Sequence, residues 1–159
     1  QVPRTQPPRL RPRAGAEGGL TMAVRQLSVF LENRTGTLCE VTQALSDNGI
    51  DVRAITLADT VEFGILRLIV SDPVKAEEVL RAHHFTVSIT EVLCVRVDDV
   101  PGGLNAVVQL LQKEGISLEY LYAYISKSVD ASVIFYVKDC ARAEEVLRKN
   151  GIRLLSEAY

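Results

Sequence analysis

The sequence has few of the residues that form disulfides or hold metals. Its three cysteines, Cys39, Cys94 and Cys140, are odd in number and widely spaced, and its two histidines, His83 and His84, are adjacent. A disulfide framework needs an even set of cysteines, and a zinc site needs clustered cysteine and histidine ligands. We therefore expect neither of these sites, and we expect no cofactor.

Long apolar runs and an excess of positive charge are also absent. No apolar run approaches the roughly 20 residues that cross a bilayer. The formal net charge is −2; residues 1–21 contribute +3, so residues 22–159 carry −5. An acidic chain is poorly suited to a phosphate backbone. We therefore expect a cytoplasmic protein with no membrane partner and no nucleic-acid partner.

The first 21 residues differ in composition from the rest of the chain. Four of the six prolines and a glycine-rich run fall there, without the apolar segment that a secretory signal needs. We interpret residues 1–21 as a disordered leader, a tag or a mis-assigned start, with Met22 as the natural beginning.

The remaining chain contains an internal repeat. The six residues Ala76–Arg81 recur unchanged as Ala143–Arg148, at an offset of 67. Further matches upstream, such as Gly49 and Gly115, stand at an offset of 66. A hairpin turn absorbs the extra residue best, between positions 57 and 63. We therefore predict two copies of one domain, residues 22–92 and 93–159.

Hydrophobic periodicity and capping residues predict the order strand, helix, strand, strand, helix, strand in both copies. The last strand of the first copy is expected over residues 85–92 and the first strand of the second over 94–97. Right-handed crossovers place both helices of a copy on one face of its sheet. We predict an α+β protein of two tandem ferredoxin-like βαββαβ domains, with antiparallel four-stranded sheets and helices on one face.

The turn after the first strand of each copy is the strongest local feature. Glu32–Leu38 and Asp98–Leu104 both put glycine at a helix start, where unpaired amides and the helix dipole favour a carboxylate or phosphate. Asn33 can hydrogen-bond a ligand, and Asp98 or Asp99 can receive an ammonium group. Alternatively, Asn33 and Asp99 are turn and capping residues only.

These turns resemble those of the ACT domain, a regulatory module that binds small molecules. Its pattern is an apolar strand, a turn of the type E-N-x-P-G-x-L or D-x-P-G-x-L, a helix, and G-I/V-x-I before the second strand. The first copy has Glu32–Leu38 and then Gly49–Val52; the second has Asp99–Leu104 and then Gly115–Leu118. The resemblance covers residues 26 to about 157 and is closest to stand-alone bacterial proteins with two ACT domains.

The resemblance implies that a free amino acid binds where two ACT domains meet, against the turn of one domain and the start of the second strand of the other. The implied ligand-binding residues are Asn33, Arg34, Thr35, Gly36, Thr37, Leu38 and Asp51 in the first copy, and Asp99, Val100, Pro101, Gly102, Gly103, Leu104 and Ser117 in the second. Thr35 replaces the usual proline, and the second turn lacks a counterpart of Asn33. If one pocket is used, we expect the Asn33 turn.

The resemblance also implies that the protein acts through partners. We expect an amino-acid-binding regulatory protein that is not an enzyme and acts on another protein, for which a metabolic enzyme is a candidate. Exposed sheet edges predict a homodimer. The alternative is a regulatory subunit or interaction module that senses no ligand.

Two other features each permit two interpretations. Tyr120, Tyr122 and Tyr124 alternate along one strand and are expected to share a face with Ile116 and Leu118, either as part of a pocket or as a core or domain contact. The adjacent histidines at 83 and 84 follow a helix and are expected to cap it, in preference to a metal or catalytic role.

Two other functions are compatible with this order of elements. Acylphosphatases grip phosphate with an arginine and an asparagine, which Arg34 and Asn33 superficially match, but the glycine spacing differs and no nucleophilic triad replaces the motif. RRM domains stack RNA bases on aromatic residues, yet Phe63–Leu68 lacks their further aromatics and the chain is acidic. Both functions are therefore disfavoured.

Overall fold

The computed structural model describes residues 21–59, 63–125 and 131–156. Its elements are β1 (Ala23–Glu32), α1 (Thr37–Asp47), β2 (Val52–Asp59), β3 (Phe63–Val70), α2 (Pro73–Ala82), β4 (Thr86–Val97), α3 (Gly103–Lys113), β5 (Leu118–Tyr124), β6 (Ala131–Val137), α4 (Cys140–Lys149) and β7 (Leu154–Leu155). The predicted order of elements is present, except that β4 replaces two expected strands. Apart from Thr21, the predicted leader over residues 1–21 lies outside the described residues.

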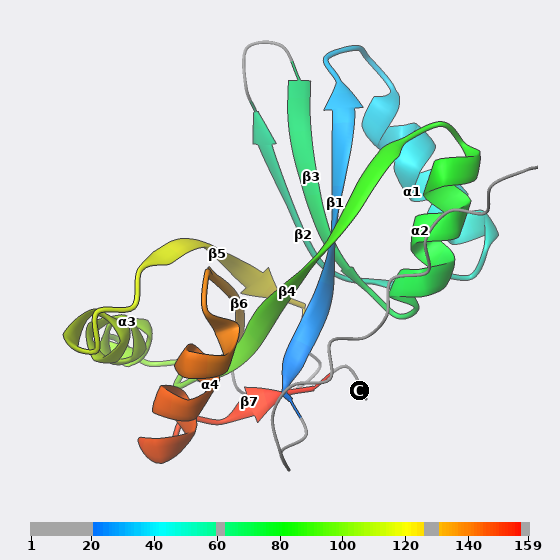
Figure 1. Cartoon of the computed structure of the whole chain (residues 1–159). Coiled ribbons are helices and arrows are strands. Elements are labelled where there is room, and N and C mark those ends of the chain that lie inside the picture. Colours follow the sequence, from blue (N-terminus) through cyan, green and yellow to red (C-terminus); the bar gives the residue numbers. More distant parts are fainter. Residues whose placement is uncertain (1–20, 60–62, 126–130, 157–159) are drawn as a thin grey trace, which may run out of the picture.

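The strands form a closed barrel. Their order is β1, β3, β2, β5, β6 and β4, and β4 pairs again with β1, while β7 adds to β4. Every pairing is antiparallel. Our prediction of a separate antiparallel four-stranded sheet for each ferredoxin-like domain is therefore wrong: the described residues form a six-stranded antiparallel barrel with four helices (Figure 1).

The continuous strand β4 is the physical reason for the barrel. It pairs with β1 as far as Leu93, and from Leu93 onward it pairs with β6. Residues 91–97 contain no glycine or proline, so nothing ends the strand at the expected boundary between residues 92 and 93. A single pair between β2 and β5, Ala54 with Tyr124, closes the ring.

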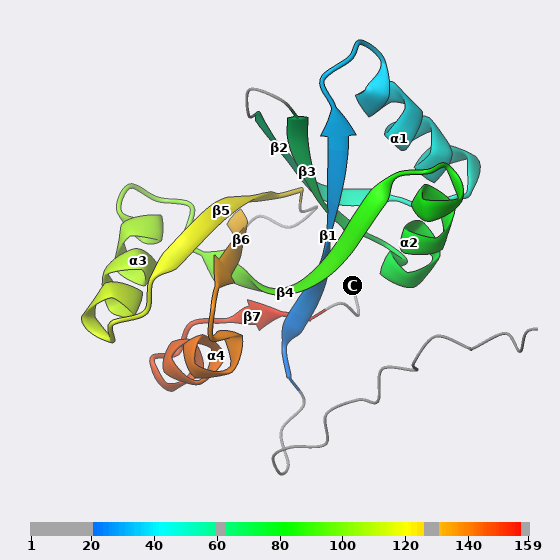
Figure 2. The ribbon, with the colours of Figure 1, turned by 45° about the horizontal axis from the view of Figure 1, so that its top comes forward.

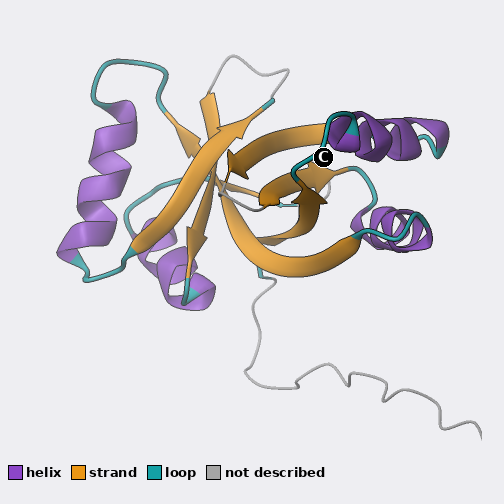
Figure 3. Ribbon diagram, turned by 90° about the horizontal axis from the view of Figure 1, so that it is seen from above, coloured by secondary structure: helices purple, strands orange, loops and turns teal. Residues whose placement is uncertain are grey.

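The helices lie in two pairs outside the barrel. Figures 2 and 3 show α1 and α2 on one side and α3 and α4 on the other. Each pair buries an apolar core against the adjoining strands, with Leu27, Leu66 and Leu80 fully buried in the first and Phe135 and Leu147 in the second. Strand residues of the opposite parity face inward and form a third core that includes Val24, Ile69, Cys94 and Ile134.

The interior of the barrel also holds a polar network. Gln26 is fully buried; its amide nitrogen donates to the hydroxyl of Tyr120, and its amide oxygen accepts from the hydroxyl of Tyr122, both at 2.7 Å. Tyr120 stacks on Tyr136, with ring centroids 4.8 Å apart. The guanidinium of Arg67 lies over the Tyr120 ring, 4.0 Å from its centroid. Burial raises the pKa of Tyr122 far above its usual range, so its hydroxyl stays a donor.

The tyrosines therefore belong to the core that both halves share. Tyr120, Tyr122 and Tyr124 all contribute to the barrel interior, whereas Ile116 and Leu118 pack into the outer core beneath α3 and α4. The expectation that all five share one face is wrong. A register irregularity between Leu118 and Tyr120, in the pairing of β5 with β6, accompanies this change of side.

The buried thiol of Cys94 gives the fold a dependence on alkaline pH. Burial raises the pKa of Cys94 from an ordinary value of 9.0 to about 12. The pKa of the thiol is higher in the folded state than in the unfolded state. The thiol's contribution to stability is therefore complete below pH 9 and is lost as the pH rises from 9 toward 12. Urea denaturation across that range is expected to show a steeper loss for the unsubstituted protein than for Cys94→Ala.

The exposed thiol of Cys39 provides the control for this experiment. Cys39→Ala is expected to keep the steep loss of stability. Equal slopes for the unsubstituted protein and Cys94→Ala would contradict the assignment of the alkaline effect to the buried thiol.

Candidate functional site

The two turns that follow β1 and β4 adopt the same backbone conformation. Gly36 caps the start of α1 with φ 93° and ψ −10°, and Gly102 caps α3 with φ 88° and ψ −7°. This left-handed conformation favours glycine. Neither of these two described caps receives a side-chain hydrogen bond, so the first amides of each helix lack a side-chain cap. The two turns therefore share one backbone geometry at the start of a helix.

The first turn is held by its own side chains. Thr37 is buried, and its hydroxyl donates to the carbonyls of Glu32 (3.1 Å) and Arg34 (2.8 Å). Both terminal nitrogens of Arg34 donate to the carboxylate of Glu40, at 2.8 and 2.9 Å. This hydrogen-bonded pair lowers the pKa of Glu40 and raises that of Arg34. A carboxylate of the chain itself therefore occupies Arg34 in this structure.

The second turn is packed more tightly. Gly103 stands where the first copy has Thr37, and a Cβ added there would come within 2.0 Å of the carbonyl oxygen of Asp98. The Gly103 amide donates to the carbonyl of Val100 at 3.0 Å. The end of β4 therefore approaches the start of α3 more closely than a side chain allows.

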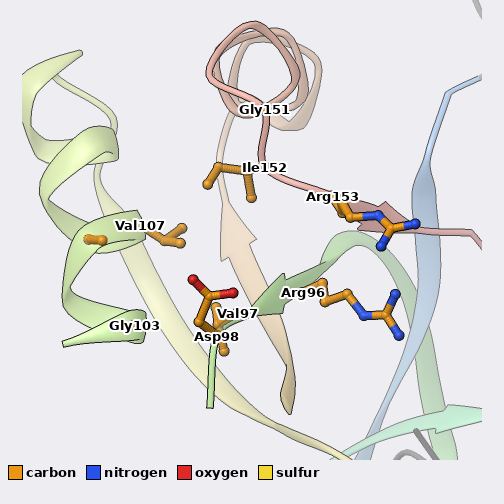
Figure 4. Close-up of a pocket in the computed structure, with 9 residues that line it drawn as sticks. Arg96, Val97, Asp98, Gly103, Val107, Gly151, Ile152 and Arg153 are labelled. Carbon is orange, nitrogen blue, oxygen red and sulfur yellow. The ribbon is translucent and has the colours of Figure 1, made fainter. Parts of the chain in front are cut away.

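A pocket of about 230 Å³ opens beside this second turn. It is lined by Arg96, Val97, Asp98, Gly103, Ala106, Val107, Gly151, Ile152 and Arg153. In Figure 4 the Asp98 carboxylate points toward Val107 and Ile152, whereas the side chains of Arg96 and Arg153 extend side by side in the opposite direction, away from these three residues. The residue pattern predicted Asp98 and Gly103 for this region but gave no signal for Arg96 and Arg153. The pairing of β4 with the segment before β7 brings these two arginines together (Arg96 N to Arg153 O, 2.9 Å).

The two turns lie at opposite ends of the molecule. The Asn33 turn leaves β1 beside the first residue of β4, because Phe30 pairs with Thr86, whereas the second turn leaves the far end of β4 after Val97. Eleven residues of extended strand span up to about 36 Å. Residues 33–38 and 99–104 of one chain therefore do not meet.

Asp51 and Ser117, the predicted ligand-binding residues just before β2 and β5, do not lie beside the turn of their own copy. Asp51 exchanges hydrogen bonds with Ser71 beyond the end of β3, away from the Asn33 turn, and Ser117 precedes Leu118, which pairs with the far end of β6. Neighbouring positions across β4, β6, β5 and β2 are Arg96, Ser132, Tyr124 and Ala54. Because β2 runs opposite to β4, residues before Ala54 lie at the end of the barrel where β4 stops. Asp51 therefore lies toward the same end of the barrel as the second turn.

The part of the chain that the structure describes shows no cluster typical of a metal site. Within the described ranges, no group of three or more histidine, cysteine, aspartate or glutamate residues is placed to hold a metal ion. His83 donates from Nδ1 to the carbonyl of Val79 (2.8 Å) at the end of α2, as a helix-capping residue does. None of the described helices is both long and apolar enough to cross a membrane.

The model of one protein family, described as the ACT domain pair, matches residues 22–158. The chain belongs to this family. This ACT domain pair is similar to protein BT0572 from Bacteroides thetaiotaomicron, with 39% identity, a TM-score of 0.81, and coverage of 86% of this chain and 94% of that one. No curated protein sequence matches it.

A more distant likeness is to the ligand-free regulatory subunit of aspartate kinase from Thermus thermophilus. Identity is 20%, the TM-score is 0.60, and the match covers 80% of this chain and 90% of that one. The corresponding subunit from Thermus flavus is 19% identical, with a TM-score of 0.57. At this identity the likeness shows the fold alone.

Proposed function

We propose that this ACT domain pair binds a free amino acid and passes that signal to another protein without catalysing a reaction. The observation that carries the proposal is the duplicated turn, in which Gly36 and Gly102 leave the first amides of α1 and α3 without a side-chain cap. The aspartate kinase regulatory subunits share the fold and are regulatory proteins by name. A metabolic enzyme in the cytoplasm is the proposed target.

The charges of a free amino acid match these turns. The helix-start amides receive its carboxylate, and an acidic side chain or a carbonyl receives its ammonium group. The proposed ligand-binding residues remain those named from the sequence, residues 33–38 and Asp51 in the first copy and residues 99–104 and Ser117 in the second. Because the two turns of one chain do not meet, each site is completed locally or by a second chain.

A homodimer forms part of the proposal. Among the described residues, β2 contacts the neighbouring β5 through the pair Ala54 and Tyr124 and a hydrogen bond from the Ile125 amide to the Arg53 carbonyl, at its first residues only. Ile55 and Leu57, which follow on β2, are exposed. An exposed strand edge with apolar side chains favours pairing with another strand. A second copy of the chain is the proposed partner at this edge.

A thermal-shift screen with the twenty amino acids tests the proposal. A ligand that binds the folded state is expected to raise the melting temperature. At a ligand concentration of 100 times Kd, binding adds about 2.7 kcal/mol to the free energy of unfolding. Asn33→Ala and Asp99→Ala are expected to weaken the response at their own turns, with the exposed Asn105→Ala as the matched control. Sedimentation velocity on the same samples measures the dimer.

The proposal fails if no amino acid shifts the melting temperature and calorimetry detects no heat of binding. Sedimentation as a monomer at micromolar concentration, with and without ligand, would exclude the homodimer while leaving ligand binding intact.

A further inference from the structure

Near the Asn33 turn, the inward face of the first half carries a row of polar side chains. The row runs across β4, β1, β3 and β2 and consists of Ser88, Ser28, Arg67 and Thr56. These residues have the parity of Val24, Ile69 and Ala54, which face the barrel interior, so the row lies on the side away from α1 and α2 (Figure 3). Ser88 is exposed, and Arg67 and Thr56 are partly exposed, so the row reaches solvent.

The guanidinium of Arg67 is held in place by the aromatic network below it. It lies 4.0 Å from the ring centroid of Tyr120, and that ring also stacks on Tyr136. The buried Gln26 fixes the Tyr120 hydroxyl at 2.7 Å. A guanidinium stacked on an aromatic ring keeps its N–H donors in its own plane, where a planar anion can reach them. Over the described ranges, no carboxylate pairs with Arg67.

Hydroxyl groups beside Arg67 supply further hydrogen-bond donors. Ser28 on β1 and Thr56 on β2 are its direct neighbours across the sheet, at a strand separation of about 4.8 Å. The Tyr120 hydroxyl accepts from Gln26, so its own proton is available to an acceptor. The row contains one positive charge and no acidic side chain. It therefore suits an anion and offers nothing to an ammonium group.

An apolar strip borders this row on the side of the Asn33 turn. Phe30, Ile65 and Ala58 are neighbours across β1, β3 and β2, two residues along each strand from the polar row. The side chain of Phe30 is 42% exposed, and Ile65 and Ala58 are partly exposed. An anion at Arg67 therefore has accessible apolar surface next to it, which suits a ligand with an apolar chain.

We propose that the polar row and the apolar strip together bind a monocarboxylate that carries an apolar chain and no ammonium group. The guanidinium of Arg67 receives the carboxylate through two parallel hydrogen bonds, and the chain lies on Phe30 and Ile65. A carboxylate carries one negative charge, which one guanidinium neutralises, whereas a phosphate monoester carries nearly two. None of these residues belongs to the proposed amino-acid sites, so this is a second ligand site beyond the proposed function.

The internal repeat shows that the fold does not require a polar row at this position. At the repeat offsets of 66 and 67, the counterparts of Ser28, Thr56, Arg67 and Ser88 are Cys94, Tyr122, Ile134 and Leu155. All four counterparts belong to the core inside the barrel. The second half therefore fills the same inward face with its core, and the first half leaves it polar and open. This difference supports a binding role for the first half.

Titration calorimetry on the full chain tests the inference with three small probes. Isocaproate has a carboxylate and a branched apolar chain, isoamylamine has the same chain with an ammonium group, and acetate has the carboxylate without the chain. Isocaproate is expected to bind at least tenfold more tightly than acetate, and isoamylamine is expected not to bind. Arg67→Gln is expected to weaken isocaproate binding at least tenfold, and Arg67→Lys to retain part of the affinity.

Two further variants separate the site from a general effect on charge or folding. Phe30→Ser changes an exposed side chain and is expected to remove most of the advantage of isocaproate over acetate. Lys113→Gln removes one positive charge from the last turn of α3 and is expected to leave isocaproate binding unchanged.

The contrary results are distinct from those that would overturn the proposed function. If isocaproate does not bind, or binds equally well to folded Arg67→Gln, the site is overturned. If phosphate binds as tightly as isocaproate, the row is a simple anion site and the inference is overturned. The response to amino acids at the two turns does not depend on Arg67. It is therefore expected to persist in Arg67→Gln, whichever result isocaproate gives.

Discussion

Replacement of Gly103 by alanine is expected to lower the free energy of unfolding by about 3 kcal/mol. The added Cβ would meet the carbonyl oxygen of Asp98 at 2.0 Å, and that atom belongs to the backbone, so either β4 or α3 must move. The same movement would deform the pocket beside the second turn. Urea denaturation measures the loss of stability, and the amino-acid titration measures the loss of binding.

The neighbouring Gly102 provides a control that separates close packing from backbone conformation. Its position is open, with no atom within 4 Å of an added Cβ, but its φ of 88° is left-handed. Gly102→Ala is therefore expected to cost about 1 to 2 kcal/mol. A smaller loss for Gly103→Ala than for Gly102→Ala would contradict the close contact with Asp98.

The second large effect is expected inside the barrel, for Gln26→Leu. This change removes both 2.7 Å hydrogen bonds and leaves the hydroxyls of Tyr120 and Tyr122 without their partner. A buried polar group without a partner costs about 1 to 3 kcal/mol. We expect a total loss of about 2 to 4 kcal/mol in the free energy of unfolding, measured by urea denaturation.

A rescue experiment distinguishes lost hydrogen bonds from poor packing. When both partners of a buried hydrogen bond become apolar, the change can be nearly neutral. The triple variant Gln26→Leu, Tyr120→Phe, Tyr122→Phe is therefore expected to recover most of the lost stability. Gln112→Leu, on the exposed surface of α3, is the control and is expected to change stability by less than about 0.5 kcal/mol. Failure of the rescue would mean that the loss came from packing.

Local structure could be predicted from the sequence because its causes are local. Asp72 before Pro73 predicts a helix start, and in the structure the Asp72 side chain caps α2 by accepting from the Lys75 amide at 3.0 Å. The glycines of the two turns are the N-caps of α1 and α3, as their position after the first strands suggested. These features depend on a few neighbouring residues, so their residue types alone reveal them.

The barrel and the pocket depend on contacts between distant segments. The pairing of Ala54 with Tyr124 joins the two copies, and no feature near either residue signals it. Periodicity treats Val92 and Cys94 as the end and start of two strands, because it cannot show that the intervening Leu93 pairs on both sides. Arg96 and Arg153 become neighbours only after β7 joins β4. The sequence therefore could not reveal which charges surround the second turn.

The strand β4 also limits how the two halves can move. It is hydrogen-bonded to β1 over its first part and to β6 over its second, so residues 92–94 offer no hinge about which the halves could rotate as independent bodies. Relative rotation requires β4 itself to twist, or β2 to part from β5 at their single paired position. A twist of β4 at one turn therefore also changes the strand at the other end of the molecule, because the same strand is hydrogen-bonded within both halves.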